Sequence, residues 1–559
     1  MPRLVGLCGA VLLGLVPAAV YGARGSEAVQ ALFSHLSEPA SRGTPPPARP
    51  GSNRPVLEAL YARRGGGTFW SRNQAPTPQA KALIGVLQSA ANYGLVPEDY
   101  GAKSLSAALA SLQADSSAKT DQWLAFDIAL SNAALMFLHD LHFGRVDPRA
   151  AHFDMPRRTE HFDDAYYLEQ LAAGSDSAAV VAQVEPNYLH YRLLRKALAR
   201  YRGLEDTVPV RGLPPLARAV APGQAFAGSP DVRRVLVALG DLSPDQAANT
   251  SPVLDAPLVN GLKRFQYLHG LRDSGVLDTA TYAALSVPLA RRVRQIELTL
   301  ERWRWVPPLE PPTLIVNIPQ FRLFLFRSTV DSEAEMLRMN VIVGRAYPQL
   351  HTPIFTAEMN AVLFRPYWEV PTSIARAEIL PQLRKNRLYL ERENLELVTS
   401  SEPEVPLPVT PENLEGLAAG RLRLRQRPGP DNSLGLIKFV LPNPYSVYLH
   451  STPAQRLFDQ PRRAFSHGCI RVSDPVALAV DVLRGTPGNW TADKVRAAMT
   501  GDLTFQVSLA QPVHVLILYG TAIATEDGAV HFFDDLYGDD RMLERLLGLR
   551  PVGQGAPRP

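Results

Sequence analysis

The residues with the clearest chemical potential lie in one short stretch, Phe465-Ser466-His467-Gly468-Cys469-Ile470-Arg471-Val472. The chain has 2 cysteines in 559 residues, and the other one, Cys8, lies in an apolar segment typical of a cleaved export signal. The exported protein would then carry one thiol with no partner for an intramolecular disulfide. An unpaired thiol in an oxidising compartment indicates a chemical role, and nucleophilic catalysis is the leading hypothesis.

A histidine stands at a defined distance upstream of this stretch. Residues 447–453 are predicted to form a short strand that ends in a turn at His450, and 15 residues separate His450 from Ser466. A histidine followed at this interval by Ser-His-Gly-Cys-Ile-Arg resembles the active-site signature of the L,D-transpeptidases of bacterial cell walls. The last signature position in that family is usually Asn, and here it is Asp474.

A cysteine attacks acyl groups as the thiolate, so a neighbouring imidazole must take its proton or lower its pKa. The resemblance implies Cys469 as nucleophile and His450 as proton donor and acceptor, with the backbone carbonyl of Ser451 orienting the imidazole. His467 shares the loop of the cysteine. It is the alternative base, or it shapes the region around the oxyanion.

The remaining site predictions concern the oxyanion and the substrate. Gly468 has no side chain, so its N–H and that of Cys469 can converge on the developing oxyanion, a contribution of roughly 3–4 kcal/mol per donor. Arg471 either folds the loop by binding backbone carbonyls or meets a substrate carboxylate. We also assign substrate-binding roles to Arg471, Ser466, Tyr448 and Trp368.

A structural zinc site is the alternative interpretation of the same residues. His450, His467 and Cys469 are ligand types that zinc accepts, but no fourth ligand of the cysteine type exists and a His-Gly-Cys tripeptide has poor chelate geometry. His139 and His142 lack partners at ligand spacing. We therefore predict no metal and no cofactor, because a thiol and an imidazole suffice for acyl transfer.

The elements that must position these residues belong to a predicted β-rich catalytic domain, residues 312–545. Runs such as Thr313 to Ile318, Phe321 to Phe326 and Met339 to Gly344 are β-branched and aromatic, and turn residues separate them. The charged, partly helical residues 372–426 occupy the place of a capping subdomain in the family. Asp474 and Pro475 form an N-cap and first-turn pair that opens a helix.

Helices are predicted upstream, which makes the fold class multidomain α+β. Residues 56–227 resemble the helical scaffold domain of the large Gram-negative L,D-transpeptidases. Residues 228–287 resemble the small peptidoglycan-binding module through Lys263-Arg264-Phe265-Gln266 and His269-Gly270-Leu271, although a plain three-helix bundle is the alternative. A connecting helix, residues 288–311, follows.

The chain ends complete the organisation. Residues 1–23 are predicted to be a signal peptide and residues 24–55 a proline-rich linker, which indicates a periplasmic protein, tethered to the membrane if the signal stays uncleaved. No later run approaches membrane-spanning length, and residues 546–559 are predicted to form a tail. The net charge of +4 is scattered, without the basic block that nucleic-acid binders show, so no nucleic-acid partner is expected.

The resemblance implies an enzyme that forms a cysteine thioester with a tetrapeptide stem of peptidoglycan and releases D-alanine. It then transfers the acyl group to a diamino-acid amine of another stem. Peptidoglycan stems are therefore the expected partners, with penicillin-binding proteins or other wall synthases as further candidates. Two alternatives remain: an L,D-carboxypeptidase or endopeptidase that uses the same thiol, and a non-catalytic wall-binding scaffold. The family is also sensitive to carbapenems, which implies an adduct on Cys469.

Overall fold

The computed structural model describes residues 53–65, 67–155, 158, 162–174, 176–205, 213–328, 336–401 and 405–550. The predicted signal peptide, nearly all of the linker and the last residues of the tail lie outside this part. The described residues form two compact units, one made of residues up to 145 and from 162 to 186, the other of the remainder. The predicted class, helical upstream and β-rich downstream, is confirmed.

The first unit is helical. Its longest helix, α5 (Thr120–Phe143), is buried along most of its length among the others. The remaining helices and the small β-hairpin of this unit are α2 (Arg54–Arg63), β1 (Ser71–Arg72), β2 (Ala75–Pro76), α3 (Pro78–Gln88), α4 (Ala102–Ala114), α6 (Asp164–Ala173) and α7 (Ser177–Val184).

Helix α5 is long and apolar enough to cross a membrane, with 24 residues and a mean hydropathy of 1.3 in its best window. The sequence prediction that no later run approaches spanning length was therefore wrong for this helix. However, 72% of that window is buried inside the unit. Its apolar residues pack against α3, α4, α6 and α7, as those of a core helix do.

The second unit begins earlier in the chain than the predicted catalytic domain. Helix α8 (Leu189–Glu205), which lies within the predicted scaffold domain, packs with α12 (Leu289–Trp305). Tyr191, Leu194 and Leu198 of α8 belong to the same apolar core as the strands of the sheet. The helical period is therefore correct here, but the burial partners of α8 lie far along the chain.

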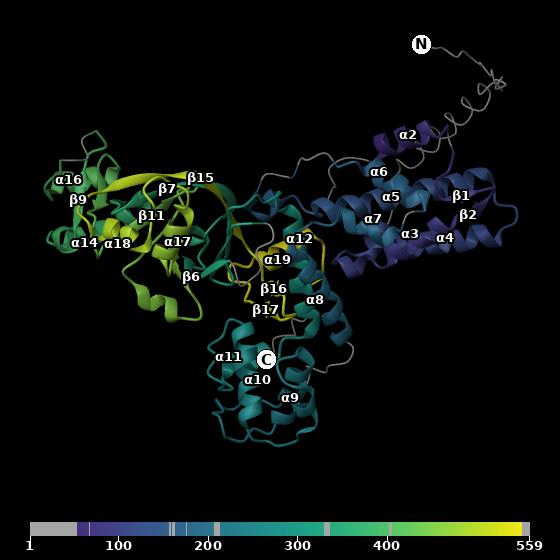
Figure 1. The fold of residues 1–559 in the computed structure, drawn as a ribbon, viewed down its shortest axis with the longest axis horizontal. Coiled ribbons are helices and arrows are strands. Elements are labelled where there is room, and N and C mark those ends of the chain that lie inside the picture. The colour runs from purple at the N-terminus through teal and green to yellow at the C-terminus, as the bar shows by residue number, and fades with distance from the viewer. Residues whose placement is uncertain are drawn as a thin grey trace, which may run out of the picture. The chain divides into compact units, whose positions relative to one another are not determined.

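Three helices form a separate lobe of this unit in Figure 1, namely α9 (Ser229–Leu239), α10 (Ala256–Leu268) and α11 (Thr279–Leu285). They enclose their own apolar core. The landmark residues of the predicted wall-binding module support this core: Phe265 is buried, and the side chain of Gln266 bonds Gly275 N and Val276 O. Wall binding by this three-helix unit stays a prediction.

The large sheet has the strand order β11-β12-β14-β6-β5-β4-β15-β7-β3, and β11 also pairs with β7, which closes it into a barrel. Strand β13 pairs with β6. The strands are β3 (Phe153–Asp154), β4 (Thr313–Asn317), β5 (Arg322–Phe326), β6 (Leu337–Gly344), β7 (Ile354–Phe364), β11 (Ile437–Val440), β12 (Leu449–His450), β13 (Ala464–Ser466), β14 (Ile470–Val472) and β15 (Phe505–Leu518).

A cap with its own apolar core follows β7 in sequence. Figure 1 shows its helices α14 and α16 and its strand β9 together at one end of this unit, beside β7 and β11. The cap consists of β8 (Trp368–Glu369), α13 (Thr372–Ile374), the π-helical turn η6 (Ala375–Ile379), α14 (Leu380–Lys385), α15 (Tyr389–Arg392), β9 (Leu395–Val398), α16 (Pro411–Ala419) and β10 (Arg423–Gln426).

The segment that follows the active-site loop supplies the last helices and strands of the second unit. Helix α17 (Pro475–Val482) begins as predicted, because the carboxylate of Asp474 accepts a hydrogen bond from Ala477 N at 2.9 Å. Helix α18 (Ala492–Thr500), the hairpin of β16 (Ala522–Ala524) and β17 (Val530–Phe532), and α19 (Asp539–Leu546) follow. A fully buried ion pair of 2.5 Å between Arg302 and Asp540 joins α12 to α19.

Candidate active site

Strand pairing places the predicted chemical residues on one face of the sheet. His450 on β12 lies opposite Lys438 on β11 and opposite Arg471 on β14. Side chains of a strand alternate between its two faces, so Tyr448 and Cys469, each two positions earlier, share this face. The parallel pairing of β12 with β14 thus brings together two segments that are distant in sequence.

His450 is buried, with 3% of its surface exposed, and its ring is fixed. Its Nδ1 lies 2.6 Å from the carbonyl oxygen of Ser451, as predicted. A carbonyl only accepts, so Nδ1 carries the proton and Nε2 holds the lone pair that a base needs. Burial, together with the charges of Arg471 and Lys438, lowers the pKa of His450 to about 3, so the imidazole is neutral near pH 7.

The hydroxyl of Ser451 secures the turn that follows His450. It accepts hydrogen bonds from the N–H groups of Leu436 and Ile437 and donates one to the carbonyl of Leu434. Gly435 approaches so closely that an added Cβ would lie 2.2 Å from Ser451 Oγ, and its φ is +63°. Only glycine fits there, and the tight packing holds the carbonyl that orients His450.

The thiol of Cys469 is partly exposed and protonated at rest. Burial of the sulfur raises its pKa, and Tyr448, Lys438 and Arg471 oppose that shift. Its Sγ lies 3.9 Å from the carbonyl of Ser446. No hydrogen bond joins this thiol to His450 within the described residues, so proton transfer between them requires a rotation of the cysteine side chain or one bridging water.

The loop before Cys469 is held by hydrogen bonds among its own residues, and these correct one prediction. Ser466 is buried, and its hydroxyl donates to the carbonyl of Cys469 at 2.6 Å while accepting from Gly468 N at 3.1 Å. Ser466 therefore closes the loop, and its substrate-binding role stays a prediction. The Gly468 N–H is not the oxyanion donor we predicted, because Ser466 occupies it. The N–H of Cys469 has no acceptor among the described residues and remains available.

Gly468 nevertheless has a conformational role. Its φ of +119° is in the region that favours glycine, and its carbonyl accepts a 2.8 Å hydrogen bond from the hydroxyl of Thr352. The same hydroxyl accepts from Gly344 N at 2.9 Å. Thr352 thus ties the end of β6 to the loop that presents the thiol.

His467 points toward the cap. Its Nε2 lies 2.7 Å from the carboxylate of Glu378, which belongs to η6. This contact links the loop of Cys469 to the cap, and the role of His467 in the reaction stays a prediction. The described residues contain no group of three or more His, Cys, Asp or Glu side chains arranged to hold a metal.

Comparisons with known proteins agree with this arrangement. Residues 55–198 match the Scaffold domain family, and residues 311–490 match the L,D-transpeptidase catalytic domain family, YkuD. The chain carries a YkuD L,D-transpeptidase catalytic domain. A curated protein of Haemophilus influenzae named "Putative L,D-transpeptidase" is 28% identical over 251 residues, which is 45% of this chain and 49% of that protein. The chain thus matches about half the length of this curated relative.

Arg471 in the YkuD domain has no structural partner. The two roles left open by the sequence were binding of loop carbonyls and binding of a substrate carboxylate. Among the described residues its guanidinium forms no hydrogen bond, and its buried Nε has no acceptor. Burial lowers the pKa of Arg471 while the nearby Cys469 opposes this shift. The unpaired cation beside the thiol favours the substrate role.

Tyr448 and Trp368, the other two predicted substrate residues, lie in different surroundings. Tyr448 is half-buried beside the thiol, and burial together with Cys469 raises the pKa of its phenol. Trp368 lies on β8 and packs against the apolar core of the cap. The structure therefore brings Tyr448 to Cys469, whereas it makes Trp368 part of the cap.

Sequence reasoning missed Lys438. Its Nζ lies 3.9 Å from the centre of the Tyr448 ring, and burial lowers its pKa while Cys469 opposes this shift. The signal was a lysine inside the apolar strand Ile437-Lys438-Phe439-Val440 of the YkuD domain. Such a residue must face solvent or a polar site, and only its partner strand shows which.

Sequence reasoning also missed Asn443, which shapes the turn opposite the thiol. Its amide donates to the carbonyls of Leu441 and Val447, and its oxygen accepts from Tyr445 N and Val447 N. Ser446 of this turn has a φ of +55°, which is unfavourable for a residue with a side chain. The turn therefore holds the Ser446 carbonyl at the thiol at some conformational cost.

Proposed function

We propose that this protein is a periplasmic peptidoglycan L,D-transpeptidase that uses Cys469 as its nucleophile. The observation that carries the proposal is the single face of the sheet shared by a neutral imidazole, a thiol and an unpaired guanidinium, those of His450, Cys469 and Arg471. A YkuD catalytic domain and a scaffold domain in one chain support the same function.

Acylation begins from a neutral pair. His450 Nε2 takes the proton of the Cys469 thiol, and Sγ attacks the carbonyl carbon of the third stem residue, a diamino acid. The carbonyl oxygen becomes negative, and the N–H of Cys469 is the donor available to it. The C–N bond to the terminal D-alanine then breaks, the imidazolium returns its proton to the leaving amine, and a thioester remains on Cys469.

Transfer reverses these roles. The side-chain amine of a diamino acid on another stem attacks the thioester carbon, and His450 accepts a proton from that amine. The C–S bond breaks, and the proton returns to the sulfur, so the enzyme is restored and a new amide joins two stems. Water in place of the amine would yield a tripeptide and make the protein a carboxypeptidase.

Arg471 and Lys438 contribute positive charge to the same face. Arg471 binds the carboxylate of the bound stem, because a buried guanidinium without a partner gains most from a charged acceptor. Lys438 stabilises the thiolate as it forms, since its charge lowers the pKa of Cys469. Both effects grow as the substrate excludes water from the face.

Mass spectrometry of muropeptides tests the proposal. The mature protein is incubated with a disaccharide-tetrapeptide, and the products are weighed. A cross-linked dimer with loss of one D-alanine supports the transpeptidase, a tripeptide alone indicates the hydrolase, and unchanged substrate contradicts both and leaves the non-catalytic wall-binding scaffold. The Cys469→Ala variant is the control and must leave the substrate unchanged.

A carbapenem provides a second test of the same site. Its strained β-lactam carbonyl offers the thiolate an activated acyl group, and the opened ring keeps the leaving amine attached, so release is hindered. Intact-protein mass spectrometry should show one adduct on the mature protein and none on Cys469→Ala. An adduct on both proteins would place the reactive group elsewhere.

A further inference from the structure

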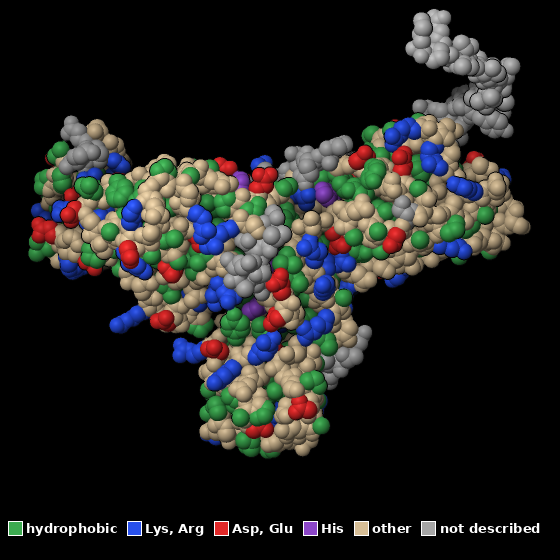
Figure 2. Space-filling model, in the orientation of Figure 1, with side chains coloured by type: hydrophobic (Ala, Val, Ile, Leu, Met, Phe, Trp, Pro, Cys, Tyr) green, Lys and Arg blue, Asp and Glu red, His purple; other side chains and the backbone are tan. Residues whose placement is uncertain are grey.

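A second candidate site lies where the three-helix unit meets the YkuD domain. A cavity of about 320 Å³ is lined by Tyr267 and residues 269–273 of the three-helix unit, by residues 319–322 and 458–463 of the YkuD domain, and by residues in and near β17. In Figure 2, Lys and Arg side chains gather with a few Asp and Glu where this lobe joins the rest of its unit. None of the active-site residues described above lines the cavity.

Arg322 is the chemical centre of this cavity. It is half-buried on β5, and none of the described carboxylates forms an ion pair with it. Burial, together with the charge of Arg322, lowers the pKa of Arg463 to about 10. Burial, with Arg322 and Arg264, also lowers the pKa of His531 to about 4, so this imidazole is neutral near pH 7. A half-buried guanidinium that interacts with a second arginine cation, and has no carboxylate partner, is stabilised by a bound anion.

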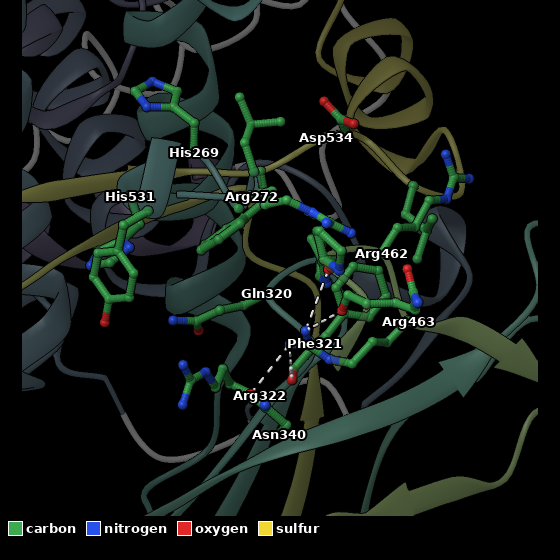
Figure 3. Close-up of a pocket in the computed structure, with 18 of the residues that line it drawn as sticks. His269, Arg272, Gln320, Phe321, Arg322, Asn340, Arg462, Arg463, His531 and Asp534 are labelled. Atoms are coloured by element: carbon green, nitrogen blue, oxygen red, sulfur yellow. Dashed lines mark hydrogen bonds between the residues drawn. The ribbon is translucent and has the colours of Figure 1, made fainter. Parts of the chain in front are cut away.

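The other polar groups of the cavity differ in how many of their hydrogen bonds are already made within the protein. Arg463 builds the wall, since its guanidinium donates to the carbonyls of Phe321 at 3.1 Å and Gln460 at 2.7 Å. The amide oxygen of Gln320 accepts from Asn317, so its NH₂ group is left to donate. Figure 3 shows the Gln320 amide and the Arg322 guanidinium on the same side of the cavity, where His531 also lies.

The carboxylates of the cavity do not neutralise this cluster. Asp273, Asp459 and Asp534 line the cavity, but all three are exposed, whereas Arg322 is half-buried. Solvent screens the exposed charges more than the half-buried one. A planar guanidinium beside an amide NH₂ is suited to a carboxylate, which can accept two parallel hydrogen bonds.

The cavity continues into a larger one. A second cavity of about 370 Å³ shares Tyr267, Gln320, Arg322 and His531 with the first. Trp303, whose buried indole N–H has no acceptor in the described part of the chain, lines this second cavity. Tyr267 is 54% exposed and offers an aromatic surface at the junction. The space therefore fits an extended ligand that carries a carboxylate next to a sugar or peptide backbone.

We propose that this junction pocket binds the carboxylate of a peptidoglycan stem, with Arg322 as its main contact, and so holds a wall strand apart from the one being acylated. The proposal rests on the proposed function for the identity of the ligand. Residues 458–463 run directly into β13 and the loop of Cys469. A strand held at this junction pocket is thus attached to the segment that presents the nucleophile.

Hydrogen exchange read by mass spectrometry tests the pocket with the full mature chain in a Cys469→Ala background, where no turnover occurs. The probe is a disaccharide-tripeptide. We expect it to slow exchange in residues 267–273, 319–322 and 458–463, and we expect Arg322→Gln to raise the half-saturating concentration at least tenfold. Arg496→Gln, an exposed arginine outside the pocket, is the matched control and should leave it unchanged.

Two further measurements, one with a second variant and one with a second probe, distinguish carboxylate binding from other causes of protection. Arg322→Lys keeps the charge and should retain most of the protection, which separates loss of binding from loss of fold. Chitohexaose, a glycan without carboxylates, should give no protection. Equal protection in Arg322→Gln, equal protection by chitohexaose, or no protection by the tripeptide probe in the unaltered pocket would each overturn the proposal.

The outcome is independent of the test of the proposed function. If muropeptide dimers form but these segments stay unprotected, the junction pocket proposal fails and the transpeptidase stands. If the segments are protected through Arg322 but the protein forms neither dimer nor tripeptide, the pocket stands and the transpeptidase fails.

Discussion

Two buried polar clusters of this protein are built in opposite ways. In the helical unit, the fully buried carboxylate of Asp127 accepts hydrogen bonds from Tyr61 Oη at 2.7 Å, Phe69 N at 2.8 Å, Trp70 N at 2.7 Å and Ser71 Oγ at 3.2 Å. Both oxygens of the carboxylate therefore accept hydrogen bonds. Such a cluster fixes α2 and the segment of residues 69–71 against α5, and it leaves no acceptor site on the carboxylate for a ligand.

The face around Cys469 is the contrary case. Arg471 has a buried nitrogen without an acceptor among the described residues, and the thiol has only weak acceptors and donors around it, such as the Ser446 carbonyl at 3.9 Å and Tyr448. Unused polar groups in a buried place lower stability, and a protein retains them where a substrate will supply the partner. The comparison teaches that the polar groups of a structural cluster have all their hydrogen-bond partners within the protein, whereas those of a reactive cluster do not.

The largest expected effect is that of Cys469→Ala. Turnover should fall by at least about 10⁴-fold, because no other group can form the thioester. The melting temperature should stay within about 2 °C, since removal of a neutral thiol leaves no buried charge unpaired. Muropeptide analysis and thermal unfolding measure the two quantities. Full activity in this variant would contradict the thiol mechanism.

The second-largest effect is the difference in acylation rate between variants of the two histidines. His450→Ala should slow acylation by about 10²- to 10⁴-fold, the usual contribution of a general base. His467→Ala removes only the half-exposed contact with Glu378 and should cost less than about tenfold. Single-turnover adduct formation with a carbapenem measures both rates. The reverse order would show that His467 is the base.

Asp127→Asn should break the saturated cluster. Each carboxylate oxygen accepts from one backbone N–H, and the amide nitrogen of Asn cannot accept, so the backbone N–H of Phe69 or Trp70 is left without a partner. We expect a loss of about 2–4 kcal/mol in the stability of the helical unit. Asp121→Asn, an exposed position of the same helix, is the control and should cost a few tenths of a kcal/mol. Denaturant unfolding measures both variants, and equal stabilities would refute the structural role of the cluster.

Arg471→Met should, in contrast to Asp127→Asn, lower activity without lowering stability. The kcat/KM should fall by about 10- to 100-fold, the value of a hydrogen bond to a charged group, because the substrate carboxylate loses its partner. Stability should be unchanged or higher, since an unpaired buried charge has been replaced by an apolar chain. A clear loss of stability with normal kcat/KM would assign Arg471 to the fold of the loop.

The smallest effect concerns the thiol pKa. Burial raises the pKa of Cys469, so alkylation by iodoacetamide should be slow near pH 7 and should rise with an inflection above that of a free thiol. Lys438 lowers this pKa, so Lys438→Met should move the inflection further upward. Mass spectrometry across a pH series measures the rates. An inflection below that of a free thiol would mean that the resting site holds a thiolate.

Local patterns of the sequence determined the secondary structure of most segments and the types of the catalytic residues. Helical and strand periods depend on neighbouring residues, so the helical units and the β-rich domain were predictable. The interval between His450 and Cys469 indicated the chemistry, and Asp474 with Pro475 indicated the start of α17. The Ser451 carbonyl contact was also correct, because it joins adjacent residues.

Only the tertiary structure decided which side chains meet. Ser466 and Gly468 bond each other, His467 meets the cap, and Lys438 joins the reactive face across two strand pairings. Each of these facts depends on strand register or on a partner far along the chain, and a shift of one residue reverses the face of every side chain. The residue types were therefore readable in sequence, whereas their directions and partners were set by the packing of distant segments.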